Sequence, residues 1–196
     1  MTGDINGTTM RVVLESLKTV SGPQYEMLLQ RAGLDRFLKE LPAADGKTAA
    51  TGEELVRLFT VVYMMLGEVC TRLFHRNCGV AYADGIMRSG WGDKMQAKAA
   101  TIPADQKLPW VVRELIALAE HSYSPQIVSE DAAAWYLASA TCYVCLGLQG
   151  VKAPICTSTE TMYKELAKKL VGRTVRVVEV DCAALGASHC KFAIYK

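Results

Sequence analysis

The sequence has no excess of charge of either sign. Its 22 Lys and Arg residues nearly balance its 20 Asp and Glu residues, which leaves a formal net charge of +2, and the basic residues are scattered along the chain. A protein that binds nucleic acid or an acidic membrane surface needs a concentrated basic patch. We therefore expect neither nucleic acid nor a membrane surface as a partner.

Long apolar segments are also missing. The start of the chain carries Asp4 and has no apolar stretch before Arg11, so neither a secretory signal nor a transit peptide is predicted. The longest uncharged run, 132–148, has 17 residues and is shorter than the ~20 residues that span a bilayer. We interpret this run as buried sheet, and we expect a cytoplasmic protein with no membrane span.

Motifs for catalysis are absent as well. The chain has no glycine-rich phosphate loop, no dinucleotide-binding fingerprint and no recognisable catalytic triad. A reductase needs a hydride donor, and no motif for a nicotinamide or a flavin is present. The histidines, His75, His121 and His189, are isolated and lack a haem-binding motif. These absences favour binding over catalysis.

The residues that are present predict one α+β domain. With 196 residues and 51% apolar side chains, the chain is long enough to bury a core. Residues 8–121 have mainly helical periodicity, and Thr51 with Glu54 has the form of a capping box. Helices are expected from Thr8 or Thr9 to Val20, around Tyr25–Leu29, at 51–79, at 80–100 and at 105–119, with a polar loop at 42–50.

The pattern changes after Pro125, and residues 126–196 are expected to form a small antiparallel sheet with one helix. Aromatic and β-branched residues predict strands at 126–130, 135–141, 174–180 and 189–195. The helix is expected at 158–171, before Gly172. Helices followed by such a sheet are typical of an α+β fold, with the helices packed on the sheet.

Five of the seven cysteines lie in the last 55 residues. Reduced thiols are expected without an export signal, so metal binding or simple burial must explain them. Spacing leaves two ligand sets for a tetrahedral metal site open. One set is Cys142, Cys145, Cys182 and Cys190, and the other includes Cys156 and Glu179.

Glu179 favours the metal interpretation. It lies between Val178 and Val180 in a short apolar strand, where a carboxylate is costly to bury unless it meets a cation. In a regular strand Glu179 and Cys182 would point to opposite faces. Both can therefore serve one metal only if the chain bends near Asp181.

The C-terminal residues resemble the 4-vinyl reductase domain family, whose members end in Glu-x2-Cys-x3-Gly-x3-Cys-x-Phe. The corresponding residues are Glu179, Cys182, Gly186, Cys190 and Phe192. A Cys-x2-Cys-x-Gly segment at 142–147 and a Pro-x-Cys segment at 154–156 are also similar to the family. The resemblance is specific over about 140–194 and general before it.

The resemblance implies a structural zinc ion. In the phenol-sensing domains of bacterial activators, which are relatives in this family, a Cys, a Glu and two further Cys hold zinc. The matching residues are Cys156, Glu179, Cys182 and Cys190. This leaves Cys142 and Cys145 as an additional metal-binding or thiol pair. With all four positions filled by protein, the ion would join the last helix to the final hairpin.

The resemblance also implies an apolar cavity between helices and sheet, a fold shared with haem nitric-oxide sensors and vesicle-tethering subunits. We expect a sensor or carrier for a small hydrophobic or aromatic molecule, acting as a homodimer through its N-terminal helices. Trp110 and Trp135 are candidate pocket residues, because an indole N–H can donate to a ligand oxygen, although each can equally be core. The alternatives are a role in tetrapyrrole vinyl reduction and an assembly module with a filled core.

Overall fold

The computed structural model describes residues 3–120, 126–139 and 141–196. The fold is a mixed helical and antiparallel β domain, which confirms the expected class. Its main elements are β1 (Asp4–Asn6), α1 (Gly7–Ser21), α2 (Tyr25–Arg31), α3 (Arg36–Lys39), β2 (Thr48–Thr51), α4 (Gly52–Met87), α5 (Gly90–Ala99), α6 (Ala104–Glu120), β3 (Gln126–Glu130), β4 (Ala134–Ser139), α7 (Thr157–Val171), β5 (Val177–Asp181) and β6 (Cys190–Tyr195).

The first helix begins slightly earlier than the sequence predicts. Asn6, rather than Thr8 or Thr9, caps α1, because its side chain accepts a hydrogen bond of 2.8 Å from the Thr9 N–H. The polar loop expected at 42–50 also differs, since its end forms β2, which pairs antiparallel with β1. Strands as short as these carry too little hydrophobic alternation to be predicted.

The longest helix, α4, begins at the predicted capping box. The Thr51 hydroxyl accepts the Glu54 N–H, and the Glu54 carboxylate accepts the Thr51 N–H. Gly67, with a φ of 74°, kinks the helix. The break expected near Gly79 is wrong, because α4 continues to Met87. Gly79 is instead a point of close contact, where an added Cβ would lie 2.8 Å from the Thr161 Cβ on α7.

The C-terminal sheet has the strand order β3-β4-β6-β5, and every neighbouring pair is antiparallel. β4 ends at Ser139 and β5 begins at Val177, so both strands are shorter than predicted. A register shift interrupts the pairing of β5 with β6 between Glu179 and Asp181. This irregularity is the bend that the sequence required near Asp181.

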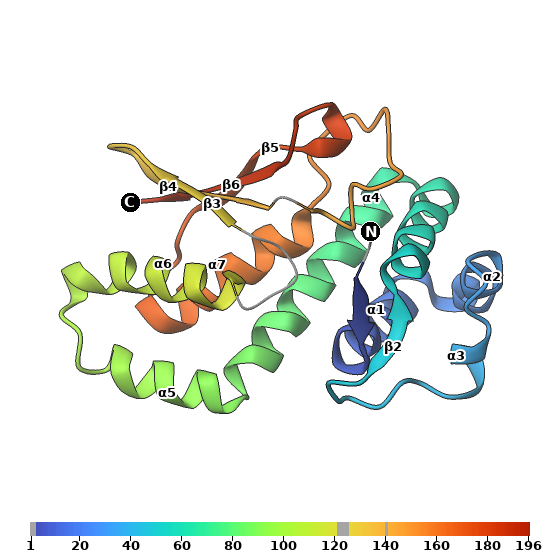
Figure 1. Ribbon diagram of the computed structural model, residues 1–196, viewed down its shortest axis with the longest axis horizontal. Helices are drawn as coiled ribbons and strands as arrows, with labels where there is room; N and C mark the ends of the chain where they lie inside the picture. Colours follow the sequence, from blue (N-terminus) through green and yellow to red (C-terminus); the bar gives the residue numbers. More distant parts are fainter. Residues whose placement is uncertain (1–2, 121–125, 140) are drawn as a thin grey trace.

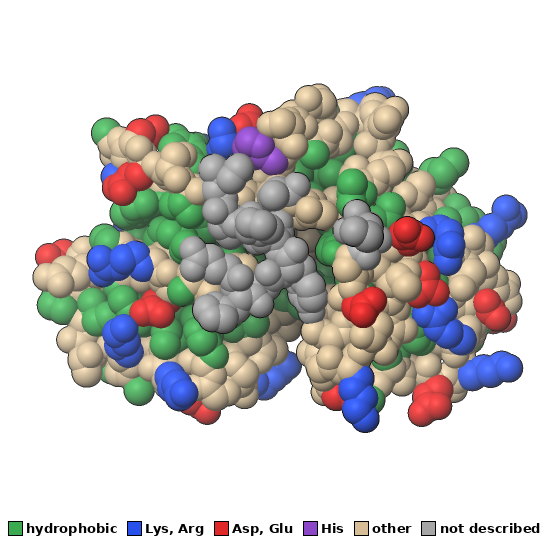
Figure 2. Space-filling view, in the orientation of Figure 1, with side chains coloured by type: hydrophobic (Ala, Val, Ile, Leu, Met, Phe, Trp, Pro, Cys, Tyr) green, Lys and Arg blue, Asp and Glu red, His purple; other side chains and the backbone are tan. Residues whose placement is uncertain are grey.

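Figure 1 shows α6 and α7 beneath one face of this sheet, with the long helix α4 crossing beside α7 and the N-terminal elements beyond it. Contacts between α4 and α7 are the most extensive between any two elements. On the face shown in Figure 2, basic and acidic side chains are interspersed. The metal donors and the ligand cavity both border α7.

Candidate metal centre and ligand cavity

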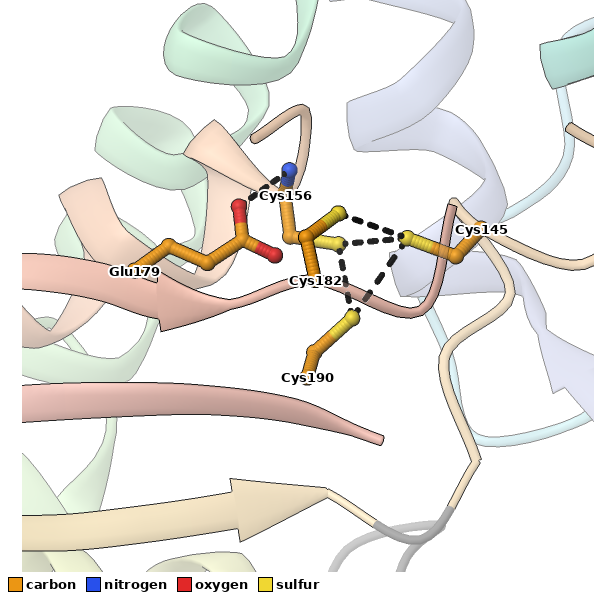
Figure 3. A group of neighbouring side chains, drawn as sticks. All are labelled: Cys145, Cys156, Glu179, Cys182 and Cys190. Carbon is orange, nitrogen blue, oxygen red and sulfur yellow. Dashed lines mark hydrogen bonds between the residues drawn. The ribbon is translucent and has the colours of Figure 1, made fainter. Parts of the chain in front are cut away.

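Four thiols and one carboxylate form a buried cluster between the sheet and the start of α7 (Figure 3). Their candidate ligand atoms all lie within 4.8 Å of one another. The cluster consists of Cys145, Cys156, Glu179, Cys182 and Cys190. The structure thus brings together all four residues that the resemblance implies as ligands, and adds Cys145.

Local structure explains how most of these side chains converge. Cys156 directly precedes α7, and Cys190 is the first residue of β6. Glu179 lies on β5, and Cys182 follows the end of that strand. The register shift between Glu179 and Asp181 allows Glu179 and Cys182 to reach the same cluster.

A tight turn after β4 brings the remaining cysteines to the same place. The backbone N–H groups of Cys145 and Leu146 both donate to the Cys142 carbonyl at 3.0 Å. The Cys142 Sγ lies 3.0 Å and the Cys145 Sγ 3.1 Å from the Cys156 Sγ. The two ligand sets left open by the spacing therefore meet in one cluster.

The separations between sulfur atoms suit a single metal ion. The Cys145 Sγ is 3.6 Å from the Cys182 Sγ and 3.4 Å from the Cys190 Sγ. The Cys156 and Cys190 sulfurs are 3.5 Å apart. Thiolates on a tetrahedral zinc ion, each at ~2.3 Å from the metal, lie ~3.8 Å from one another. Only a small expansion separates the two arrangements.

Glu179 is the most unusual member of the cluster. Its Oε2 atom accepts a hydrogen bond of 2.9 Å from the Cys156 N–H, while its buried Oε1 has no hydrogen-bond partner among the described residues. Burial, followed by the negative charge of Cys182, raises the pKa of Glu179 to about 9. A bound cation would supply the missing partner for Oε1, so the donor set fits a metal.

The thiols also differ in their tendency to ionise. Hydrogen bonds from other thiols, that of Cys145 first, lower the pKa of Cys182 to about 6. Hydrogen bonds led by that of Cys142 lower the pKa of Cys190 to about 5. The pKa of Cys156 is raised, first by its contact with Cys142. The cluster therefore favours thiolates at two positions, and the thiolate is the form that binds metal.

A cavity of about 520 Å³ lies beside this cluster. Its volume is within the range of small-molecule sites. Side chains from α1, α4, α6 and α7 form most of its wall, which is largely apolar. Representative lining residues are Val12, Val13, Phe59, His75, Cys78, Tyr82, Leu115, Met162, Tyr163 and Phe192.

His75 provides the unsatisfied polar atom of this cavity. The side chain is fully buried, and its Nε2 atom has no hydrogen-bond partner among the described residues. Burial lowers the pKa of His75 to about 3, so the ring is neutral at physiological pH. The rings of Phe59 and Phe74 each lie with their centroid 4.8 Å from that of His75. A ligand with one polar group would find its partner here.

Neither tryptophan proposed for the pocket lines the cavity. Trp110 lies on α6, where its indole N–H donates to the Glu114 carboxylate at 2.7 Å. Trp135 lies on β4, and the Lys196 ammonium is 4.9 Å from its ring centroid. Both residues have intramolecular partners, so the pocket assignment from the sequence is corrected. His75 was missed because nothing in its local sequence separates it from a buried core histidine.

The remaining cysteines and histidines lie apart from the metal donors. Cys70 is exposed, whereas Cys78 is buried in the cavity wall, where burial raises its pKa to about 12. His189 interacts through Nδ1 with the Ser188 hydroxyl at 2.8 Å. His121 lies outside the described residues. Among the described helices, none is both long and apolar enough to cross a membrane.

Comparison with known families identifies the metal-binding part of the chain. Residues 135–196 match the family model of the 4-vinyl reductase domain. The resemblance seen in the sequence is thereby confirmed for this segment, which includes every member of the cysteine and glutamate cluster. No curated protein matches the sequence.

Solved structures with the same fold cover nearly the whole chain. The phenol-responsive sensory domain of the transcription activator PoxR, determined with phenol, has a TM-score of 0.50 at 16% identity over 89% of this chain and 90% of its own. An H-NOX protein from S. oneidensis in the Fe(II)NO ligation state has a TM-score of 0.54 at 13% identity over 98% of this chain and 99% of its own. These likenesses confirm the fold.

Proposed function

We propose that the protein is a sensor or carrier domain that binds a small hydrophobic or aromatic molecule with one hydrogen-bonding group. The observation that carries this proposal is the unpartnered Nε2 atom of His75 in the wall of a largely apolar cavity. Apolar burial supplies affinity in such a site, and a single polar contact fixes the orientation of the ligand. The shared fold with the phenol-responsive domain supports this proposal.

The metal belongs to the same proposal. We assign it to Cys156, Glu179, Cys182 and Cys190, and zinc is the ion that this donor set favours. When bound, it would stabilise the fold rather than activate a water molecule. An iron–sulfur cluster fits less well, because its thiolates bind different irons, whereas these sulfurs contact one another.

Calorimetric titration with phenol tests the ligand proposal. We expect phenol to bind the wild-type protein more tightly than toluene, which has a similar shape but lacks the hydroxyl group. In His75→Phe the affinity for phenol should fall about tenfold, because one hydrogen bond is lost, while the affinity for toluene changes little. Trp110→Phe is the matched control and should bind phenol as the wild type does, since Trp110 lies outside the cavity wall.

Two outcomes would contradict the ligand proposal. One is a folded wild-type protein that binds neither phenol nor toluene. The other is equal loss of phenol affinity in Trp110→Phe and His75→Phe, which would place the ligand outside the described cavity.

A tetrapyrrole is the second candidate ligand. The observation that favours it is again the neutral, buried His75, because an imidazole with a free nitrogen is a ligand for haem iron. Adding haemin to the purified protein distinguishes the two ligands. A Soret band that shifts in the wild type and stays unshifted in His75→Phe would favour the tetrapyrrole, whereas no shift in either would favour the smaller ligand.

We also propose a homodimer. Apolar side chains of α4 are exposed near its kink, notably Met64 at 77% and Val69 at 82%, with Leu73 one turn further on. Contiguous exposed apolar residues mark interaction surfaces. The assembly-module alternative expects a filled core, and the cavity of about 520 Å³ argues against that alternative.

A further inference from the structure

The cluster contains one more donor than a tetrahedral metal ion uses. In Figure 3, Glu179 and Cys145 approach the group from opposite sides, and the other three cysteines lie between them. Cys156, Cys182 and Cys190 therefore form a shared set of three thiols, with one further donor on each side. The ligand set implied by the family uses the donor on the Glu179 side, which leaves Cys145 without a role.

The contacts of Cys145 are those of a ligand. Its sulfur lies 3.1–3.6 Å from all three shared sulfurs, and the residue is buried. The turn that begins at Cys142 fixes its position through backbone hydrogen bonds. A thiolate is also a softer donor than a carboxylate and competes well for zinc. Cys145 thus meets the requirements of geometry, burial and chemistry.

We propose that Cys145 is a metal ligand that exchanges with Glu179 for the fourth coordination position. This inference rests on the proposed metal site. In one arrangement Glu179 completes the site beside the three shared thiolates, and in the other Cys145 completes it. The hydrogen bond from the Cys156 N–H holds the Glu179 carboxylate close to the site in both arrangements.

The exchange conserves charge. As the Cys145 sulfur binds, its thiol proton passes to the released Glu179 carboxylate, so one metal–oxygen bond is replaced by one metal–sulfur bond. No oxidant or reductant takes part.

The exchange connects the metal centre to the ligand cavity. Cys142, at the start of the same turn, lines the cavity, and its sulfur is 3.0 Å from that of Cys156. A second hollow of about 340 Å³ on this turn is lined by Cys142, Cys145 and Cys190. Movement of Cys145 toward or away from the ion therefore displaces part of the cavity wall.

Cobalt(II) titration of the metal-stripped, full-length chain tests the proposal. The sulfur-to-cobalt charge-transfer absorbance reports how many thiolates bind. We expect Glu179→Gln and Cys145→Ser each to bind one cobalt per chain, with the absorbance about one third higher in Glu179→Gln, which has four thiolates rather than three. The double variant should bind cobalt ~100-fold more weakly than either single variant. Cys70→Ser, an exposed thiol outside the cluster, is the matched control.

The outcomes separate this inference from the proposed function. A folded wild-type chain that binds no cobalt would overturn the metal site itself. Cobalt binding by the wild type but not by Glu179→Gln, or equal absorbance in the two single variants, would overturn only the exchange. X-ray absorption of the zinc-loaded wild type needs no variant: more than three sulfur neighbours per zinc supports the exchange, and three or fewer contradicts it.

Discussion

Two single residues, Glu179 and His75, carry most of the functional argument. Each presents one buried polar atom without a partner among the described residues, namely the Glu179 Oε1 and the His75 Nε2. Burying such an atom destabilises the folded state by ~1–3 kcal/mol. A metal ion beside Glu179 and a ligand beside His75 would each remove that cost.

The buried state of His75 predicts a dependence of stability on pH. Its pKa is about 3 in the folded protein, against 6.5 as the ordinary value, so the unfolded chain binds the extra proton between these pH values. The contribution of neutral His75 is complete above pH 6.5 and falls by ~1.4 kcal/mol per unit as the pH decreases toward 3.

Urea denaturation at pH 7 and pH 5 measures this effect. Over that interval the free energy of unfolding should fall by about 2 kcal/mol more in the wild type than in His75→Phe. His189→Phe should behave as the wild type does. Equal losses in the wild type and His75→Phe would mean that His75 is accessible to protons in the folded protein.

At the scale of elements, the sequence predicts strong periodic segments better than junctions. The capping box at Thr51 and the helix ending before Gly172 are both confirmed. The break of α4 near Gly79 is wrong, because a glycine that ends a helix and a glycine that lets two helices approach have the same local signal. Only the position of α7 distinguishes them.

The contact between α4 and α7 gives a prediction at this scale. In Gly79→Ala the new methyl group would clash with the Ser158 carbonyl and the Thr161 side chain, so we expect a loss of about 1–3 kcal/mol in the free energy of unfolding. Gly85→Ala, on the same helix with nothing within 4 Å, should be neutral or stabilising by about 1 kcal/mol. Urea denaturation of both variants checks this, and equal effects would contradict the close packing.

At the scale of the whole molecule, the sequence predicted the cysteine-rich region but not the cavity. The cysteines are clustered near the C-terminus, and the family motif includes most of the donors. Spacing alone could not decide between the two ligand sets, because folding merges them around Cys156. The cavity wall combines residues from α1, α4, α6 and α7, which leaves no local pattern for a reader of the sequence to find.

The proposed dimer is a property of the whole molecule. If the apolar side chains near the kink of α4 form its interface, Val69→Asp should convert the dimer to a monomer, because a charge would be buried without a partner. Sedimentation velocity at matched concentrations measures this. Val128→Asp, at an exposed position on β3, is the control and should remain dimeric. A wild-type protein that is monomeric, or a Val69→Asp variant that stays dimeric, would contradict this interface.

The central claim is that the cysteine and glutamate cluster holds a metal ion that stabilises the fold. Native mass spectrometry of the full chain, purified without added metal, tests it most directly when wild type and Cys182→Ser are compared. The account predicts one zinc ion per wild-type chain, a large loss of zinc from Cys182→Ser and a decrease in its Tm on the order of 10 °C. Cys70→Ser should keep its zinc. A wild-type chain that is fully folded and free of metal would contradict the account and make these cysteines ordinary core residues.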